Sequence, residues 1–146
     1  MLFSHAYYGT KIWYYCQILL LEGVTVIKGL GMDIIEIERV RDAIKRHDKT
    51  FINKVFTVEE QHYCERYQDP IPRYAGRFAA KEAVAKALGT GIRDKLNWLD
   101  IQILSDNMGK PSVRFSSRCK LKSGEVMISI SHSRHYATAT AIWIDT

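Results

Sequence analysis

The chain has 146 residues, enough for one domain with a core of its own, and its 47% apolar and 25% charged residues are ordinary for a globular protein. The formal net charge of +5 favours an acidic partner or a phosphorylated ligand and falls short of a nucleic-acid-binding extreme. Three widely separated cysteines without a C-x-x-C pair argue against a disulfide framework or a zinc site and favour a cytoplasmic location.

Residues 1–23 form an N-terminal extension that contains an apolar run from Ile12 to Leu21. The run is too short to span a bilayer as a helix, and no small-x-small cleavage site follows it. Three interpretations are open: an extra strand or helix, a membrane-proximal segment, or sequence that is rarely or never translated. We favour the last, a mis-assigned start, because codons for Glu22-Gly23 can resemble a ribosome-binding site ahead of start codons at Val24 and Val26.

Residues 24–28 are β-prone and lead into a short segment that carries Gly29, Gly31 and Asp33. A dinucleotide-binding fingerprint would need a third glycine where Ile34 stands, so we reject that interpretation. Two helices are then predicted. The first has an apolar stripe at Ile37, Val40 and Ile44 and cations mostly on its solvent side, at Arg39, Arg41, Lys45 and Arg46. The second opens at a capping box formed by Thr57 and Glu60 and runs through Tyr67.

The segment from Gly76 to Gly89 predicts a strong helix of alanines and long straight side chains, closed by a glycine. Four of its residues share one arc and should face the core: Ala80, Ala83, Val84 and Ala87. Glu82 and Lys86 share the opposite face with Phe78, and Arg77 and Lys81 flank that face. One carboxylate among three cations is what a metal-bound polyphosphate site would need.

After Trp98 the pattern changes to period two, which predicts strands at 98–104, 112–115, 126–130 and 136–144, with a turn at 107–111. Helices come early and strands late. We therefore expect an α+β fold: a single domain, residues 24–146, with an antiparallel sheet packed against helices.

Two acidic residues are candidates for a metal site. Asp33 follows a predicted strand, and Glu82 lies on the exposed face of the central helix. If distant segments bring them together, they can hold Mg²⁺ and leave positions open for water and phosphate oxygens. The alternative is that Asp33 caps the following helix and Glu82 pairs with Lys86 on a solvated face.

The segment Ser129 to Ser133 places hydroxyls and His132 at a strand end, where they can contact a phosphate or nucleotide. A Ser-His hydrolase is a rival interpretation, but no G-x-S-x-G elbow is present to expose a serine. A polar strand end without function is the third interpretation.

Together these segments resemble the holo-acyl-carrier-protein synthases, small bacterial 4′-phosphopantetheinyl transferases. Residues 29–40 are similar to the family's opening G-x-D motif with its trailing helix, and residues 76–91 to its central motif. Gly109-Lys110-Pro111 and residues 129–133 are similar to the later motifs in order and spacing. The resemblance runs from about Val26 to Ile144, and residues before Val24 have no counterpart in the family pattern.

The resemblance implies transfer of the phosphopantetheine arm of coenzyme A to a serine of apo acyl carrier protein, in fatty acid biosynthesis, with release of adenosine 3′,5′-bisphosphate. Asp33 and Glu82 would ligate Mg²⁺, which also binds the pyrophosphate, and Lys86 would neutralise charge on the phosphates. Glu82, or a metal-bound water that it orients, would take the serine proton. The nucleotide's phosphate would be held, with Lys81 nearby, by Arg77, His132 and Ser133.

An acidic carrier protein would dock on the cations of the first helix, Arg39, Arg41, Lys45 and Arg46; a merely solvated face is the alternative. The family also implies a homotrimer with active sites between subunits. We expect neither a nucleic acid nor a membrane as partner. Two other functions are kept open: a metal-dependent phosphohydrolase that uses the same carboxylates, and a non-enzymatic module that binds nucleic acid through the basic helix.

Overall fold

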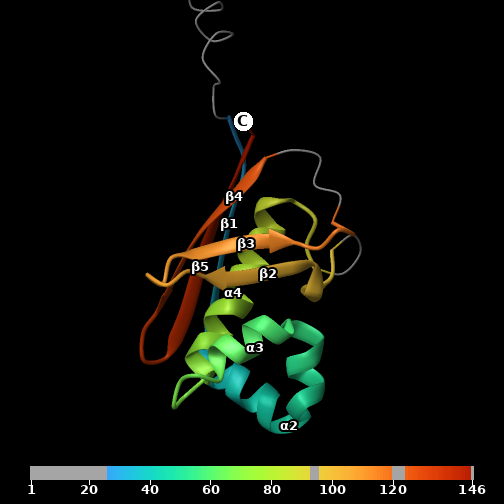
Figure 1. Ribbon diagram of the computed structural model, residues 1–146. Helices are drawn as coiled ribbons and strands as arrows, with labels where there is room; N and C mark the ends of the chain where they lie inside the picture. The colour runs from blue at the N-terminus through green and yellow to red at the C-terminus, as the bar shows by residue number, and fades with distance from the viewer. Residues whose placement is uncertain (1–25, 93–95, 120–123, 146) are drawn as a thin grey trace, which may run out of the picture.

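The computed structural model describes residues 26–92, 96–119 and 124–145, and Figure 1 shows their arrangement. The N-terminal extension lies outside the described residues, so the mis-assigned start stays a prediction. No described helix is both long and apolar enough to cross a membrane. In chain order the elements are β1 (Val26–Glu36), α2 (Ile37–Val55), α3 (Val58–Cys64), α4 (Ile71–Ala87), the 3₁₀ helix η1 (Trp98–Asp100), β2 (Ile101–Ser105), β3 (Pro111–Phe115), β4 (Glu125–His132) and β5 (Tyr136–Asp145).

The strands form two antiparallel sheets where the sequence predicted one. In the three-stranded sheet, β5 lies between β1 and β4. Strands β2 and β3 pair separately, and the turn between them contains Gly109 at a φ of 84°, a conformation that favours glycine. Strand β1 continues to Glu36, so Asp33 lies within a strand, opposite Ala139, and not at a strand end as predicted. The α+β class with antiparallel strands is confirmed.

Helix α4 contacts all three strands of the larger sheet and also β2, which makes it the centre of the molecule (Figure 1). The predicted core arc is confirmed, because Ala80, Ala83 and Val84 are fully buried and Ala87 nearly so. Small residues on both sides let the helix lie very close to β1. A methyl group added at Gly31 would overlap the carbonyl oxygen of Ala83.

Helices α2 and α3 gather at one end of the molecule and share a second apolar cluster with α4 (Figure 1). The predicted stripe is confirmed, with Ile37 and Val40 buried, while Asp48 kinks α2 through a φ of 43°. The capping box before α3 is also confirmed: Thr57 N–H donates to Glu60 Oε2 at 2.8 Å, and Glu60 N–H donates to Thr57 Oγ1 at 3.3 Å. This helix ends at Cys64, earlier than predicted.

Candidate functional site

A strand carboxylate and a helix cation meet where β1 crosses α4. Lys86, in the last turn of α4, donates to Asp33 Oδ1 at 2.7 Å and to the carbonyl oxygen of Met32 at 3.0 Å. Glu82 lies one turn earlier on the same side of the helix and is half-buried. The structure therefore brings the predicted residues Asp33, Glu82 and Lys86 to one side of α4. Lys86 forms its ion pair with Asp33, whereas the alternative interpretation paired it with Glu82.

The donor set of this cluster fits a hard divalent cation. Asp33 and Glu82 offer carboxylate oxygens only, and among the described residues no group of three or more His, Cys, Asp or Glu side chains gathers to hold a metal. Two carboxylates that leave the remaining positions to water and to a substrate's phosphate oxygens are the arrangement that Mg²⁺ prefers. Asp33 is 18% exposed, so its carboxylate is reachable from solvent although Lys86 covers one oxygen.

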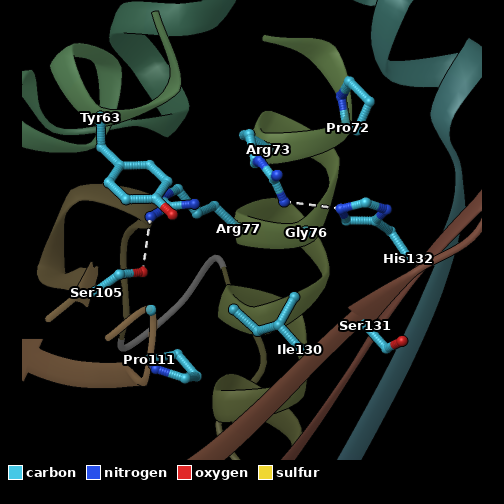
Figure 2. A pocket seen from close by; sticks show the side chains of 11 residues that line it. Tyr63, Pro72, Arg73, Gly76, Arg77, Ser105, Pro111, Ile130, Ser131 and His132 are labelled. Carbon is cyan, nitrogen blue, oxygen red and sulfur yellow. Dashed lines mark hydrogen bonds between the residues drawn. The ribbon is translucent and has the colours of Figure 1, made fainter. Parts of the chain in front are cut away.

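A pocket of about 310 Å³ lies on the other side of α4, between that helix, α3, the end of β4 and the β2–β3 hairpin (Figure 2). Its wall combines residues of the predicted central and later motifs with others that the sequence did not single out. Its lining residues are Tyr63, Pro72, Arg73, Gly76, Arg77, Ser105, Gly109, Pro111, Ile130, Ser131 and His132.

Arg77 is fixed within the wall of this pocket. The residue is only 4% exposed, and its guanidinium lies over the ring of Tyr63, 3.8 Å from the ring centroid. One nitrogen, Nη2, donates to Ser105 Oγ at 3.2 Å, as Figure 2 shows. Its Nε is buried and has no hydrogen-bond partner among the described residues. A buried donor without a partner is costly, and the guanidinium that carries it lines the pocket, where a ligand can supply an acceptor to the other N–H groups of Arg77.

His132 shares the pocket with Arg77, as the sequence predicted, but Ser133 does not line it. The hydroxyl of Ser133 accepts the backbone N–H groups of His135 (3.4 Å) and Tyr136 (3.3 Å) and so shapes the turn between β4 and β5. Sequence reasoning missed Arg73, which contacts His132. The signal was present, because Arg73 precedes Arg77 by four residues and therefore lies on the same face of α4.

Lys81 departs from its predicted place beside the nucleotide's phosphates. It is fully buried, and its ammonium pairs with Glu60 at 2.8 Å. It also donates to the carbonyl oxygens of Val55 (2.7 Å) and Trp98 (2.9 Å). Burial lowers the pKa of Lys81, and the charge of Glu60 opposes that shift. We therefore assign Lys81 to the core that joins α2, α3 and η1.

The cations predicted to receive a carrier protein differ in their partners. Arg39 is exposed, and the described residues include no ion-pair partner for it. Arg41 instead bonds Asp69 at 3.0 Å and Glu38 at 3.2 Å, and these two carboxylates raise its pKa and offset its charge. Lys45 lies 4.0 Å from Glu38. The charge of Arg39 is thus more available than that of Arg41 or Lys45.

The profile of a known family matches residues 29–141, and that family is the 4′-phosphopantetheinyl transferase superfamily. The matched residues include both the Asp33–Lys86 contact and the pocket beside Arg77, because they run from β1 through the central helix to the β4–β5 hairpin. The chain therefore belongs to this superfamily.

Comparison with individual relatives shows which members of the superfamily this chain resembles. A holo-[acyl-carrier-protein] synthase of Protochlamydia amoebophila is 52% identical over 117 residues, which are 79% of this chain and 96% of the relative. The crystal structure of the Bacillus anthracis enzyme in complex with coenzyme A (3′,5′-ADP) is 34% identical with a TM-score of 0.72, over 82% of this chain and 98% of that one. The Helicobacter pylori enzyme in complex with coenzyme A is 31% identical with a TM-score of 0.73, over 78% and 98%. Within the superfamily, this chain groups with the holo-[acyl-carrier-protein] synthases.

Proposed function

We propose that this protein transfers the 4′-phosphopantetheine group of coenzyme A to a serine of apo acyl carrier protein, releasing adenosine 3′,5′-bisphosphate, as a step that supplies fatty acid biosynthesis. Support comes from relatives named holo-[acyl-carrier-protein] synthase and from solved relatives that carry coenzyme A. The observation that carries the proposal is the contact between Asp33 of β1 and Lys86 of α4, which joins the opening motif to the central one.

Asp33, Glu82 and Lys86, which we call the Asp33 cluster, would each have a part in this reaction. Asp33 and Glu82 would hold Mg²⁺, which when bound supplies charge neutralisation and a template for in-line attack on the β-phosphorus. Lys86 would place its ammonium against the pyrophosphate oxygens and stabilise their growing charge. Glu82 would accept the proton of the attacking serine, directly or through one water.

The pocket beside Arg77 and His132 would hold the nucleotide end of coenzyme A. Within one chain this pocket is separated from the Asp33 cluster: β1 and β4 are the two edges of the larger sheet, and Lys86 follows Arg77 by nine positions along α4. Nine residues of α-helix measure about 13 Å along the axis. This separation favours a site completed by a neighbouring subunit.

A homotrimer would satisfy that need and also cover an apolar sheet face. Leu30, Met32 and Ile34 of β1 are each more than 60% exposed, on the face of the larger sheet opposite α4. Exposed apolar residues gathered on one face are typical of a subunit interface. If the enzyme is trimeric, dilution should lower its specific activity; constant activity in a monomeric fraction would argue against the trimer.

One assay tests the function. The protein is incubated with coenzyme A, Mg²⁺ and apo acyl carrier protein, and the carrier is weighed by mass spectrometry. A mass gain of one phosphopantetheine group, lost on chelation and restored by Mg²⁺, is expected. Hydrolysis of coenzyme A without change in the carrier would indicate a phosphohydrolase. Neither product, together with salt-sensitive binding of DNA or RNA, would indicate a nucleic-acid module. A cytoplasmic location, where these substrates would be found, stays a prediction.

A further inference from the structure

Arg73 takes part in the pocket through two contacts that no predicted role accounts for. Its guanidinium carbon lies 4.3 Å from the ring centroid of Tyr67, and its Nη1 lies 2.8 Å from His132 Nε2 (Figure 2). A guanidinium can only donate hydrogen bonds, so His132 Nε2 is the acceptor in this contact. The contact therefore turns one edge of the guanidinium toward the end of β4, beside the pocket.

Arg73 and Arg77 are held as a pair by a matching pair of aromatic rings. The two arginines are four residues apart on α4; the tyrosines beneath them, Tyr63 and Tyr67, are also four apart, and their hydroxyls bond each other at 3.2 Å. The ring centroids lie 5.6 Å apart. Stacking on aromatic faces fixes the plane of a guanidinium and reduces the freedom that ligand binding must remove. We call these four residues the Arg–Tyr stack.

The charge of this pocket is positive and is not neutralised from within. Its lining contains two arginines and no aspartate or glutamate. Among the described residues, neither Arg73 nor Arg77 forms an ion pair within 4.0 Å, and the buried Arg77 Nε has no acceptor. Two pre-oriented guanidinium groups that no described carboxylate neutralises are suited to a compact dianion such as a phosphomonoester.

The proposed function supplies one such group. Coenzyme A carries a pyrophosphate, which the proposal assigns to the Asp33 cluster, and a single phosphomonoester on the ribose. A phosphate oxygen is a stronger acceptor for a guanidinium than a neutral imidazole nitrogen, so it can replace His132 as the partner of Arg73. We propose that Arg73 is a specificity-determining residue: with Arg77 and His132 it binds the 3′-phosphate of coenzyme A and thereby selects coenzyme A over 3′-dephospho-coenzyme A.

This inference rests on the proposed transferase activity and is tested by comparing the two donors. Steady-state KM and kcat are measured for coenzyme A and for 3′-dephospho-coenzyme A in wild type, Arg73→Ala and Arg73→Lys. Arg66→Ala removes a neighbouring exposed arginine that does not line the pocket, and serves as the matched control. Tyr67→Ala and Tyr67→Phe test the stack, since phenylalanine keeps the aromatic face that the guanidinium uses.

Arg73→Ala should raise KM for coenzyme A about 10- to 100-fold, the effect of losing a hydrogen bond between charged groups, and should leave kcat nearly unchanged. KM for the dephospho donor should stay within about twofold of wild type, so discrimination falls. Arg73→Lys and Tyr67→Ala should give intermediate losses, while Tyr67→Phe and Arg66→Ala should behave as wild type.

Equal changes for both donors in Arg73→Ala, or no change for either, would overturn the role of Arg73. If the wild-type protein is active in those outcomes, the transferase proposal still holds and only the role of Arg73 is rejected. A wild-type protein that modifies no carrier protein would instead contradict the transferase proposal. Loss of folding in Arg73→Ala is checked by thermal unfolding, and Arg73→Lys then carries the comparison.

Discussion

Lys86 Nζ lies 2.7 Å from Asp33 Oδ1, so the last turn of α4 and the middle of β1 are joined through two residues of separate motifs. The lysine side chain is 50% exposed. An ion pair in such a position contributes only about 0–1 kcal/mol to folding, because water screens it and both side chains lose freedom. The pair is therefore better understood as part of the site than as a support for the fold.

Lys86→Met keeps most of the side chain's length and removes its charge. We expect the free energy of unfolding to change by less than about 1 kcal/mol. The rate of transfer should fall about 10²- to 10³-fold, as for other groups that stabilise charge in a transition state. Single-turnover mass spectrometry of the carrier protein measures the rate, and thermal unfolding is the control. A full rate in Lys86→Met would remove this residue from the proposed chemistry.

Local patterns in the sequence predicted most of the fold. The alanine arc of α4 and the capping box of Thr57 and Glu60 depend on residues within one or two turns, and both are confirmed. The division of the strands into two sheets depends on pairing between distant segments, such as β1 with β5. Periodicity cannot show which strands pair, so this feature needed the structure.

The site was predictable where spacing along a helix decides it. Lys86 lies on the helix face that the sequence assigned to it, but Arg77 lines a pocket on the other side of α4, and Lys81 turns inward because a buried carboxylate receives it. Glu60, the partner, is 21 residues away and was read only as part of a capping box. Its second oxygen also accepts the N–H of Ile103 at 2.9 Å, so one carboxylate links three elements. No local pattern carries that information.

Lys81→Met tests the reassignment of this lysine to the core. Removing one partner of a buried ion pair leaves the other charge without compensation, so the protein should lose about 3–5 kcal/mol of stability. Urea unfolding measures this loss. At a temperature where the variant is still folded, KM for coenzyme A should match wild type. A stable Lys81→Met protein with a raised KM would instead return Lys81 to the nucleotide site.

Gly31→Ala tests the close approach of β1 to α4. The added methyl group would overlap the carbonyl oxygen of Ala83, a backbone atom that cannot move without shifting the helix. We expect a loss of stability at the upper end of overpacking effects, about 3 kcal/mol or more, and loss of activity because Asp33 is displaced from Lys86. Lys28→Ala, on an exposed position of the same strand, should unfold at nearly the wild-type temperature. Wild-type stability in Gly31→Ala would show that strand and helix can separate freely.

Arg39→Glu tests the proposed docking of an acidic carrier protein on α2. Arg39 is exposed and has no ion-pair partner among the described residues, so reversing its charge should turn an attraction toward the carrier into a repulsion. We expect KM for the carrier to rise about 3- to 10-fold, with KM for coenzyme A unchanged. Arg41→Gln should have a smaller effect on docking, because Glu38 and Asp69 already neutralise much of that charge. The difference between wild type and Arg39→Glu should shrink as salt is raised, since exposed charges are screened within about 8 Å at physiological ionic strength. A loss that persists unchanged at high salt, or that affects both substrates equally, would point to a structural effect of the substitution and not to docking.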